Sequence, residues 1–244
     1  RKDGYLFMEY RIKQRVRYSE IAADEKVNIA QIVKYFQDCS TFQSEDIGLG
    51  FHYLETKHRA WLLLGWQIIV DRYPSFGEEI SVGTWAYDWK GIYGYRNFDI
   101  QDSNGCRIAY ANSIWVYTNT QTLAPVKADQ EDMEVYGIEP RIPMAYAPRK
   151  IRVPKEYKES DCFQIMKTHI DTNHHVNNAQ YIDLAEEYLP EGFVIGQVRA
   201  EYKHAAVLHD MIYPRISFSE HSCTVCLCNE EGIPYVIVEF NEKE

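Results

Sequence analysis

The sequence predicts an α+β protein built from two similar halves, each with one strand, one helix and then a run of antiparallel strands. Two observations support this prediction. A short segment near residue 27 recurs 149 residues later, and in both places it begins an amphipathic helix that strand-like runs follow. A stretch rich in proline and poor in periodic pattern separates the two halves.

The recurring segment defines one helix in each half. Residues 27–33 (VNIAQIV) align with residues 176–182 (VNNAQYI), with identical Val, Asn, Ala and Gln. Apolar side chains then recur at helical spacing, and glycine or proline follows each helix as a stop signal. The apolar positions are Ile29, Ile32, Val33 and Phe36 in the first helix and Ala179, Ile182, Ala185 and Leu189 in the second.

Strand-like runs precede and follow each helix. One strand is expected before each helix, at residues 10–18 and 163–170. The clearest turn signal is Asp-Ser-Asn-Gly at residues 102–105, because Asn-Gly tolerates the positive φ values of a hairpin turn. The other expected strands are residues 61–70, 80–87, 95–101 and 106–117 in the first half and 193–202, 211–218, 223–228 and 233–240 in the second.

These elements predict an N-terminal domain over residues 1–125, a proline-rich linker over 126–160 and a C-terminal domain with the active site over 161–244. Within the linker, residues 141–158 carry six basic side chains against Glu156, a net charge of +5. A solvated linker face explains such a charge run. Docking of an acidic partner is the alternative.

Composition and charge exclude several classes of protein. Hydrophobic residues make up 45% of the chain, enough for a sizeable core. The longest apolar run, residues 60–66, is far shorter than the about 20 residues of a membrane span, and the net charge of −10 argues against a nucleic-acid partner.

Six cysteines without a secretory signal predict reduced thiols and a cytoplasmic protein. Cys223, Cys226 and Cys228 lack the second ligand pair of a zinc finger, so no metal is expected.

Polar side chains gather directly before the second helix, in Asp-Thr-Asn-His-His-Val-Asn-Asn, which begins at Asp171. We expect Asp171, Asn173 and His175 to act in catalysis at this helix entrance, where free backbone N–H groups converge. The N–H groups of Val176 and Asn177 would form an oxyanion hole for a carbonyl substrate.

Each of these residues also has a plain structural interpretation. Asn177 is typical of a helix cap, Asp171 of a turn, and His175 alone of a partly buried imidazole. The corresponding residues of the first half, Asp-Glu-Lys at 24–26, contain no histidine. The sequence has neither a Gly-x-Ser-x-Gly nucleophile elbow nor a phosphate-binding glycine loop, which favours direct attack by water.

Over nearly its whole length the chain resembles the acyl-acyl-carrier-protein thioesterases of plants and bacteria. In the first half the resemblance rests on Asp-Arg-Tyr-Pro-Ser-Phe-Gly-Glu at residues 71–78, on Thr84-Trp85 and on Ser-Ile-Trp-Val at 113–116. In the second half it rests on residues 171–178 and on Tyr181-Ile182. The family implies a double (tandem) hotdog fold, in which each half wraps a curved antiparallel sheet around a central helix.

The resemblance also implies an activity and its residues. Asp171, Asn173 and His175 match the family's catalytic Asp-x-Asn-x-His motif. The implied reaction, in fatty acid biosynthesis, is hydrolysis of fatty acyl-acyl-carrier-protein to free fatty acid, without metal or organic cofactor. The family usually adds Glu-Cys in a later strand, where this chain has Ala205 and Ala206. A cysteine nucleophile and a glutamate base are thus missing, which leaves either Asp171 or His175 as the base.

Two other functions stay open: an acyl-CoA thioesterase of hotdog type, and a non-catalytic acyl-binding protein, which the two alanines favour. Arg11, Lys13, Arg15 and Arg17 share one face of the first strand and could bind CoA phosphates or an acidic carrier protein. The sequence does not define the acyl chain length or the oligomeric state, a homodimer included. A glutamate introduced at Ala205 is expected on a strand facing the site, buried and with a raised pKa.

Overall fold

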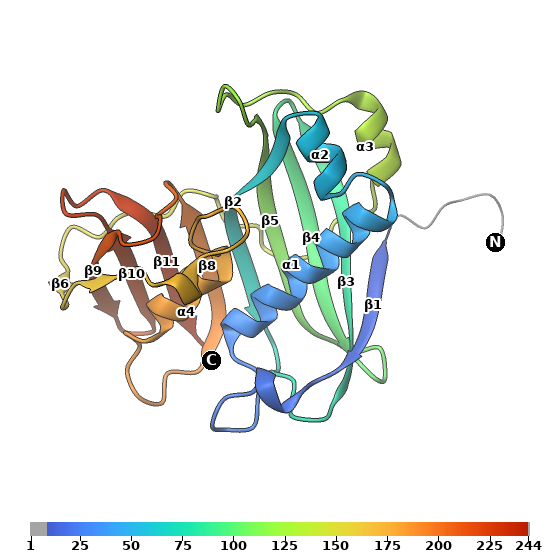
Figure 1. Ribbon diagram of the computed structural model, residues 1–244. Helices are drawn as coiled ribbons and strands as arrows, with labels where there is room; N and C mark the ends of the chain where they lie inside the picture. The colour runs from blue at the N-terminus through green and yellow to red at the C-terminus, as the bar shows by residue number, and fades with distance from the viewer. Residues whose placement is uncertain (1–8, 244) are drawn as a thin grey trace. The chain divides into compact units, whose positions relative to one another are not determined.

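The computed structural model describes residues 9–243, and the chain divides into two compact units (Figure 1). No helix of the described residues is both long and apolar enough to cross a membrane. Unit 1 comprises the chain up to Asn28, Ile32–Leu63 and Arg72–Tyr146, and unit 2 comprises Ile29–Gln31, Leu64–Asp71 and Ala147–Glu244.

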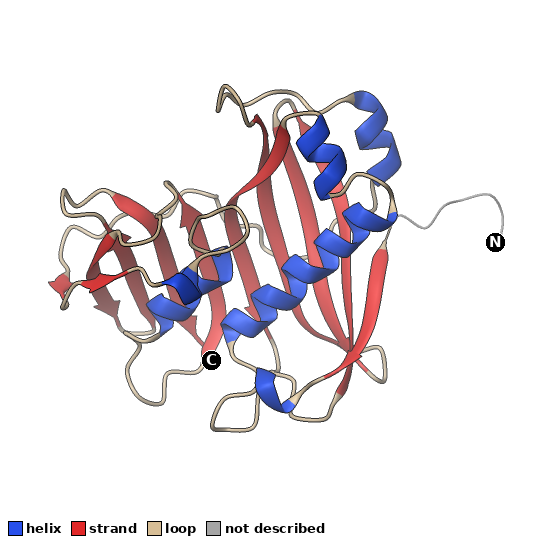
Figure 2. Ribbon diagram, viewed as in Figure 1, coloured by secondary structure: helices blue, strands red, loops and turns tan. Residues whose placement is uncertain are grey.

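Unit 1 is an antiparallel sheet with a long helix across one face (Figures 1 and 2). Its elements are β1 (Tyr10–Arg15), α1 (Ile29–Asp46), α2 (Phe51–Thr56), β2 (Arg59–Val70, shared with unit 2), β3 (Glu79–Lys90), β4 (Tyr93–Asp102), β5 (Arg107–Asn119) and α3 (Gln130–Tyr136). The strand order is β1-β3-β4-β5. Phe36 of α1 packs on Phe98 of β4 with ring centroids 5.1 Å apart, and both side chains are fully buried. This contact is part of the core between helix and sheet.

Unit 2 repeats this design with shorter elements. They are β6 (Lys158–Glu159), β7 (Phe163–Gln164), α4 (Asn178–Glu186), β8 (Ile195–Tyr202), β9 (Met211–Ser219), β10 (Ser222–Cys228) and β11 (Pro234–Glu242). The strand order is β8-β11-β10-β9, with the end of β2 paired to β8 and with β6 and β7 paired to β9. Helix α4 packs on β10 and β11 and buries Ala179, Ile182 and Ala185. The predicted α+β class is confirmed.

The turn before each helix has the same backbone geometry in both units. In unit 1 the N–H of Ala22 donates to the carbonyl of Lys26 at 2.8 Å, and the residue before Lys26 has a φ of 63°. In unit 2, 149 residues later, the N–H of Asp171 donates to the carbonyl of His175 at 2.8 Å, and the residue before His175 has a φ of 62°. The repeat in the sequence is therefore a repeat of local structure.

The segment expected to be a linker, residues 126–160, packs on the two units instead. Its first part, up to Tyr146, belongs to unit 1 and contains α3, and the rest belongs to unit 2. Ile142 and Ile151 are buried in these two parts, which explains why the segment does not extend into solvent. The units also differ from the expected domains 1–125 and 161–244, because residues 29–31 and 64–71 cluster with unit 2.

The strands before the two helices are shorter than expected. The strand predicted over residues 10–18 ends at Arg15, and the strand predicted over 163–170 is only Phe163–Gln164. A 3₁₀ turn follows each of them, at Tyr18–Glu20 and at Lys167–His169. The chain therefore bends toward the helix earlier than its residue pattern indicates.

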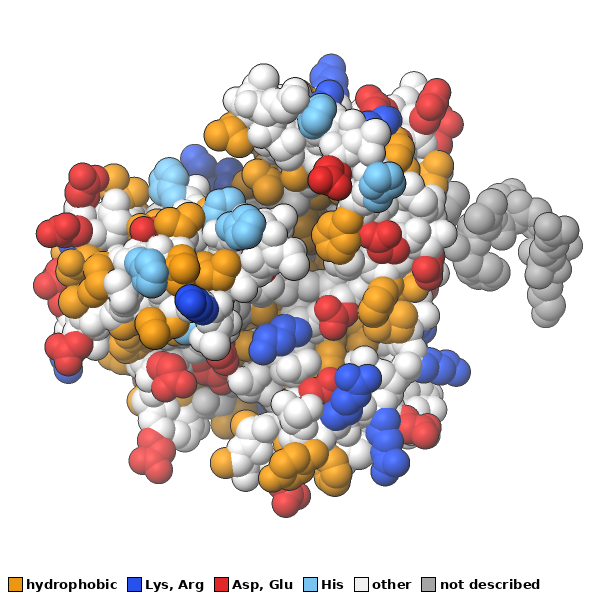
Figure 3. Space-filling view, viewed as in Figure 1, with side chains coloured by type: hydrophobic (Ala, Val, Ile, Leu, Met, Phe, Trp, Pro, Cys, Tyr) orange, Lys and Arg blue, Asp and Glu red, His pale blue; other side chains and the backbone are white. Residues whose placement is uncertain are grey.

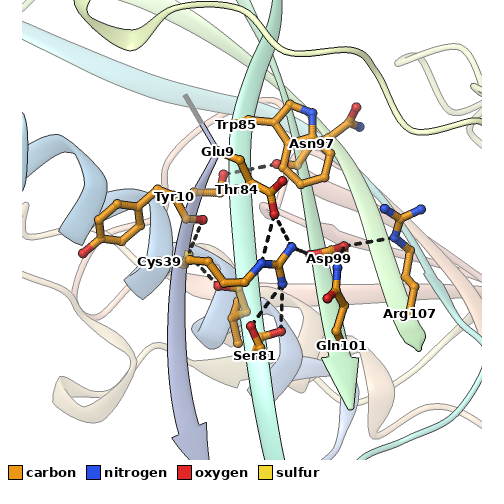
Figure 4. A network of polar contacts seen from close by, with 12 residues as sticks. Glu9, Tyr10, Cys39, Ser81, Thr84, Trp85, Asn97, Asp99, Gln101 and Arg107 are labelled. Atoms are coloured by element: carbon orange, nitrogen blue, oxygen red, sulfur yellow. Dashed lines mark hydrogen bonds and ion pairs between the residues drawn. The ribbon is translucent and has the colours of Figure 1, made fainter. Parts of the chain in front are cut away.

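A buried ionic network fixes the edge strand of unit 1 (Figure 4). The carboxylate of Asp99 on β4 is fully buried, and its Oδ1 accepts a hydrogen bond from Nη2 of Arg11 on β1 at 2.7 Å. Its Oδ2 accepts hydrogen bonds from Nε of Arg107 (3.0 Å) and Nε2 of Gln101 (2.9 Å). Arg11 reaches Asp99 past Gly83 of β3, where a Cβ atom would stand 2.7 Å from Oδ1 of Asp99. Only glycine leaves room for this pair.

The carboxyl of Glu186, at the end of α4, is expected to make the stability of the protein depend on pH. Its Oε2 is buried and has no hydrogen-bond partner in the described residues. Burial first, and then the negative charges of Asp183 and Glu187, raise the pKa of Glu186 from 4.5 to about 7. Because the pKa in the folded state lies above its ordinary value, the contribution of Glu186 is intact below pH 4.5 and is lost as the pH rises through about 7.

We therefore expect Glu186→Gln to raise the free energy of unfolding by about 1–3 kcal/mol at about pH 8 and to leave it nearly unchanged at about pH 4. Urea unfolding of parent and variant at the two pH values measures this difference. The same change at both pH values would show that the charge of Glu186 is not its cause.

Candidate active site

The three residues predicted to be catalytic form one tight turn directly before α4. The N–H of His174 donates to the carbonyl of Asp171 (3.1 Å), and the N–H of Asn173 donates to Oδ1 of Asp171 (2.8 Å). The side chains of Asn173 and His175 are exposed, and within residues 9–243 they make no hydrogen bond. The structure thus brings Asp171, Asn173 and His175 into one turn that solvent can reach.

Asn177 caps the helix that follows this turn. Its backbone is extended, with φ −60° and ψ 140°, and its side-chain oxygen accepts the N–H of Ala179 at 2.9 Å. This bond satisfies one of the free donors of the first helical turn. The side chain of Asn177 is therefore used in shaping the helix entrance.

The N–H groups of Val176 and Asn177, expected to form an oxyanion hole, are not free to bind a substrate oxygen. The N–H of Val176 donates to the carbonyl of Ala206, and the N–H of Asn177 donates to the carbonyl of His169, each at 3.0 Å. Both donors are already used inside the protein. The N–H of Asn178, the first residue of α4, has no acceptor in the described part of the chain and is a free donor at this entrance.

Two buried tyrosines hold the turn against the end of the sheet. The hydroxyl of Tyr181 accepts the N–H of Ala206, and the hydroxyl of Tyr202 donates to the carbonyl of Asn178, each at 2.8 Å. Their ring centroids lie 6.0 Å apart. Burial raises the pKa of Tyr202 well above its ordinary value, so its hydroxyl keeps the proton that it donates. No pattern in the sequence points to a role for either hydroxyl.

The position expected for a glutamate lies in a loop, not on a strand. Strand β8 ends at Tyr202, and Ala205 is exposed in the loop that follows. The next residue, Ala206, is buried and pairs with Val176 of the turn. A glutamate at position 205 would thus stand in solvent beside the turn. The expectation that burial would raise the pKa of a glutamate at this position is wrong, because the position is exposed.

Imidazoles gather on this part of unit 2. Figure 3 shows several histidines on the surface of the unit. Two of the exposed histidines belong to the turn and two to the loop after β8, and the bond between Val176 and Ala206 joins these two segments. Groups that can exchange protons are therefore accessible on both segments. These histidines are His174, His175, His204 and His209.

The matching turn of unit 1 lacks this chemistry. Lys26 stands at the position of His175, and Asp24 stands at the position of Asn173. Oδ1 of Asp24 accepts the N–H of Lys26 at 3.2 Å, so this turn is stabilised by a local bond of its own. Of the two turns, that of unit 2 alone combines an imidazole with an amide side chain.

Two of the arginines expected to dock a partner are bound to buried carboxylates. Arg11 lies 2.7 Å from Asp99, and Arg149 lies 3.6 Å from the fully buried Glu201. Their charges stabilise the fold and are only partly available to a partner. The segment that follows Arg149 in unit 2 carries four exposed basic side chains, Lys150, Arg152, Lys155 and Lys158.

Family models match both halves of the chain. The model described as acyl-ACP thioesterase N-terminal domain matches residues 8–136, and the model described as acyl-ACP thioesterase C-terminal domain matches residues 153–207. The chain belongs to the acyl-ACP thioesterase family. The family inferred from the motifs of the sequence is thereby confirmed.

Curated relatives of this family member come from plants. A palmitoyl-acyl carrier protein thioesterase of Arabidopsis thaliana is 28% identical over 208 residues, which cover 79% of this chain and 49% of the relative. An acyl-[acyl-carrier-protein] hydrolase of Cuphea viscosissima is 29% identical over 205 residues, covering 78% and 48%. The chain spans about half the length of these relatives.

Solved structures support the tandem hotdog fold. An acyl-ACP thioesterase from Bacteroides thetaiotaomicron superposes with a TM-score of 0.88 at 20% identity, covering 97% of this chain and 98% of that one. A 12:0-ACP thioesterase from Umbellularia californica superposes with a TM-score of 0.85 at 18% identity, covering 98% and 99%. At these identities the structures confirm the fold of the chain.

Proposed function

We propose that this member of the acyl-ACP thioesterase family hydrolyses fatty acyl-acyl-carrier-protein to free fatty acid and carrier protein. One observation above all supports the proposal: the turn before α4 holds Asp171, Asn173 and His175 together, open to solvent, at a helix entrance. The relatives described above carry names that state the same type of substrate.

The roles that we propose follow from what each group can donate or accept. The amide of Asn173 and the N–H of Asn178 would donate to the thioester carbonyl oxygen, which gains negative charge as water attacks. His175, whose imidazole has no internal partner among the described residues, would bind and orient the attacking water. Asp171 holds the turn in shape through its bond to the N–H of Asn173.

We also propose that the exposed cations of residues 150–155 dock the acidic carrier protein. Replacing Lys150, Arg152 and Lys155 by glutamate is expected to raise KM for acyl-carrier-protein by about tenfold or more, because opposite charges at a contact rim speed association and discriminate between partners. KM for a short thioester without carrier should change less than about twofold. Added salt should raise KM of the parent for the carrier-protein substrate alone, because it screens exposed charges.

Arg149 is left unchanged in this variant because its guanidinium faces the buried Glu201. Lys127→Glu, an exposed lysine of unit 1, is the matched control and should leave both KM values near those of the parent. An equal rise of KM for both substrates would contradict docking at residues 150–155.

Release of free fatty acid from two thioesters with the same acyl chain tests the proposed activity. We expect a higher kcat/KM on the carrier-protein thioester than on the CoA thioester. An equal or higher value on CoA would favour an acyl-CoA thioesterase. No release from either substrate, together with tight binding of the acyl group, would favour the non-catalytic acyl-binding protein that Ala205 and Ala206 suggest.

We propose a cytoplasmic location because the cysteines form no disulfide bonds among the described residues. All six lie in the described residues and are free, which suits a reducing compartment. The names of the curated relatives place those proteins in chloroplasts.

A further inference from the structure

The loop after β8 ends in a carboxylate that the roles above do not use. Oδ2 of Asp210 accepts hydrogen bonds from the backbone N–H of Val207 (2.9 Å) and from the hydroxyl of Tyr235 (3.2 Å). Its Oδ1 has no hydrogen-bond partner within residues 9–243, and the residue is half-buried. One carboxylate oxygen is therefore fixed in place while the other is left to accept a proton or a hydrogen bond.

This loop is bonded to the catalytic turn near its start and to the residue after β7 at its end. Near its start, the carbonyl of Ala206 accepts the N–H of Val176 (3.0 Å), and at its end the carbonyl of Asp210 accepts the N–H of Ile165 (2.9 Å). Two hydrogen bonds and one peptide group connect the nitrogen of Val176 to Oδ2 of Asp210, so these atoms lie at most about 8 Å apart. Because His175 directly precedes Val176, the loop that carries Asp210 is hydrogen-bonded to the turn next to His175.

Tyr181 also connects this carboxylate to the end of the sheet. Its hydroxyl accepts the N–H of Ala206, and the next N–H along the chain, that of Val207, donates to Asp210. Burial raises the pKa of Tyr181 to about 12, and the negative charges of Asp210 and Asp171 add to this rise. Both carboxylates therefore lie close enough to influence one hydroxyl at the end of the sheet.

We propose that Asp210 is the general base of this chain and takes the place of the glutamate that the family motif has at position 205. The inference rests on the proposed thioesterase function. As the oxygen of water bonds to the thioester carbonyl carbon, the carboxylate of Asp210 accepts one proton from that water. The carbon–sulfur bond then breaks, and the departing thiolate takes the proton from Asp210. The products are the fatty acid and the thiol of the carrier.

Asp210→Asn separates this role from a structural one. The amide oxygen of asparagine can still accept the N–H of Val207 and the hydroxyl of Tyr235, but the residue no longer binds a proton. We expect kcat to fall by about 10²-fold or more while KM stays within about threefold of the parent. Asp161→Asn, at an exposed aspartate of unit 2 outside this loop, is the matched control, and its kcat should stay within about twofold of the parent because solvent screens an exposed charge.

The decisive variant restores a carboxylate at the other position. Ala205→Glu added to Asp210→Asn should recover at least about tenfold of the lost kcat, since position 205 is exposed in the same loop. An unchanged kcat in folded Asp210→Asn, or a loss that Ala205→Glu does not reduce, would overturn the assignment. Parent and His175→Ala are assayed alongside. A parent without hydrolysis would overturn the proposed function together with this inference, whereas an active parent with an equally active Asp210→Asn overturns the role of Asp210 alone.

Discussion

His175→Ala is expected to lower kcat by about 10²–10⁴-fold, the usual range for loss of a group that positions or transfers a proton. The imidazole is exposed and makes no bond to the rest of the described chain, so its removal should leave the fold intact. Steady-state hydrolysis of a short acyl thioester, with thermal unfolding of the same samples, measures both properties.

Lys26→Ala is the control that the internal repeat provides. Lys26 occupies the position of His175 in a turn of the same backbone geometry. The kcat of Lys26→Ala should stay within a few-fold of the parent. A folded His175→Ala with normal turnover would remove His175 from the mechanism. A comparable loss in Lys26→Ala would show that the effect does not belong to the turn of unit 2.

Asp99→Ala is expected to lower the free energy of unfolding by about 2–4 kcal/mol, because it leaves two arginines without the buried carboxylate that they share. The side chains of Arg11 and Arg107 are 22% and 36% exposed, so water partly replaces the lost partner. This keeps the expected cost below that of a fully buried pair. Urea denaturation gives the value directly.

Glu9→Ala tests the same network at its exposed edge. Glu9 also pairs with Arg11, but its side chain is 41% exposed. The expected loss is below about 1 kcal/mol, as for other surface ion pairs. If Asp99→Ala cost no more than Glu9→Ala, the network in Figure 4 would have no special part in holding β1 to the sheet.

The general plan of each unit could be predicted because its signals are local. Helical spacing of apolar residues and the Asn-Gly turn act over a few positions, and the structure has α1, α4 and the hairpin between β4 and β5 where these signals lie. The short helices α2 and α3 were not predicted. The first follows two glycines and the second lies between prolines, and both features indicate loops in a sequence read alone.

Long-range contacts account for what the sequence did not reveal. From the sequence, the N–H groups of Val176 and Asn177 are expected to be free donors. In the structure, however, the N–H of Val176 donates to the carbonyl of Ala206, thirty residues away. The division of the chain into two units depends on residues 64–71, which pair with β8. Asp210 stands in no motif, and only the hydrogen bonds of its loop connect it to the turn.

The most direct test of the account is the amount of free fatty acid that the purified chain releases from acyl-acyl-carrier-protein, measured by mass spectrometry for the parent and for His175→Ala at equal concentration. We predict release by the parent and at least about 100-fold slower release by the variant. Equal release by both, or none by the parent, would contradict hydrolysis at the turn before α4.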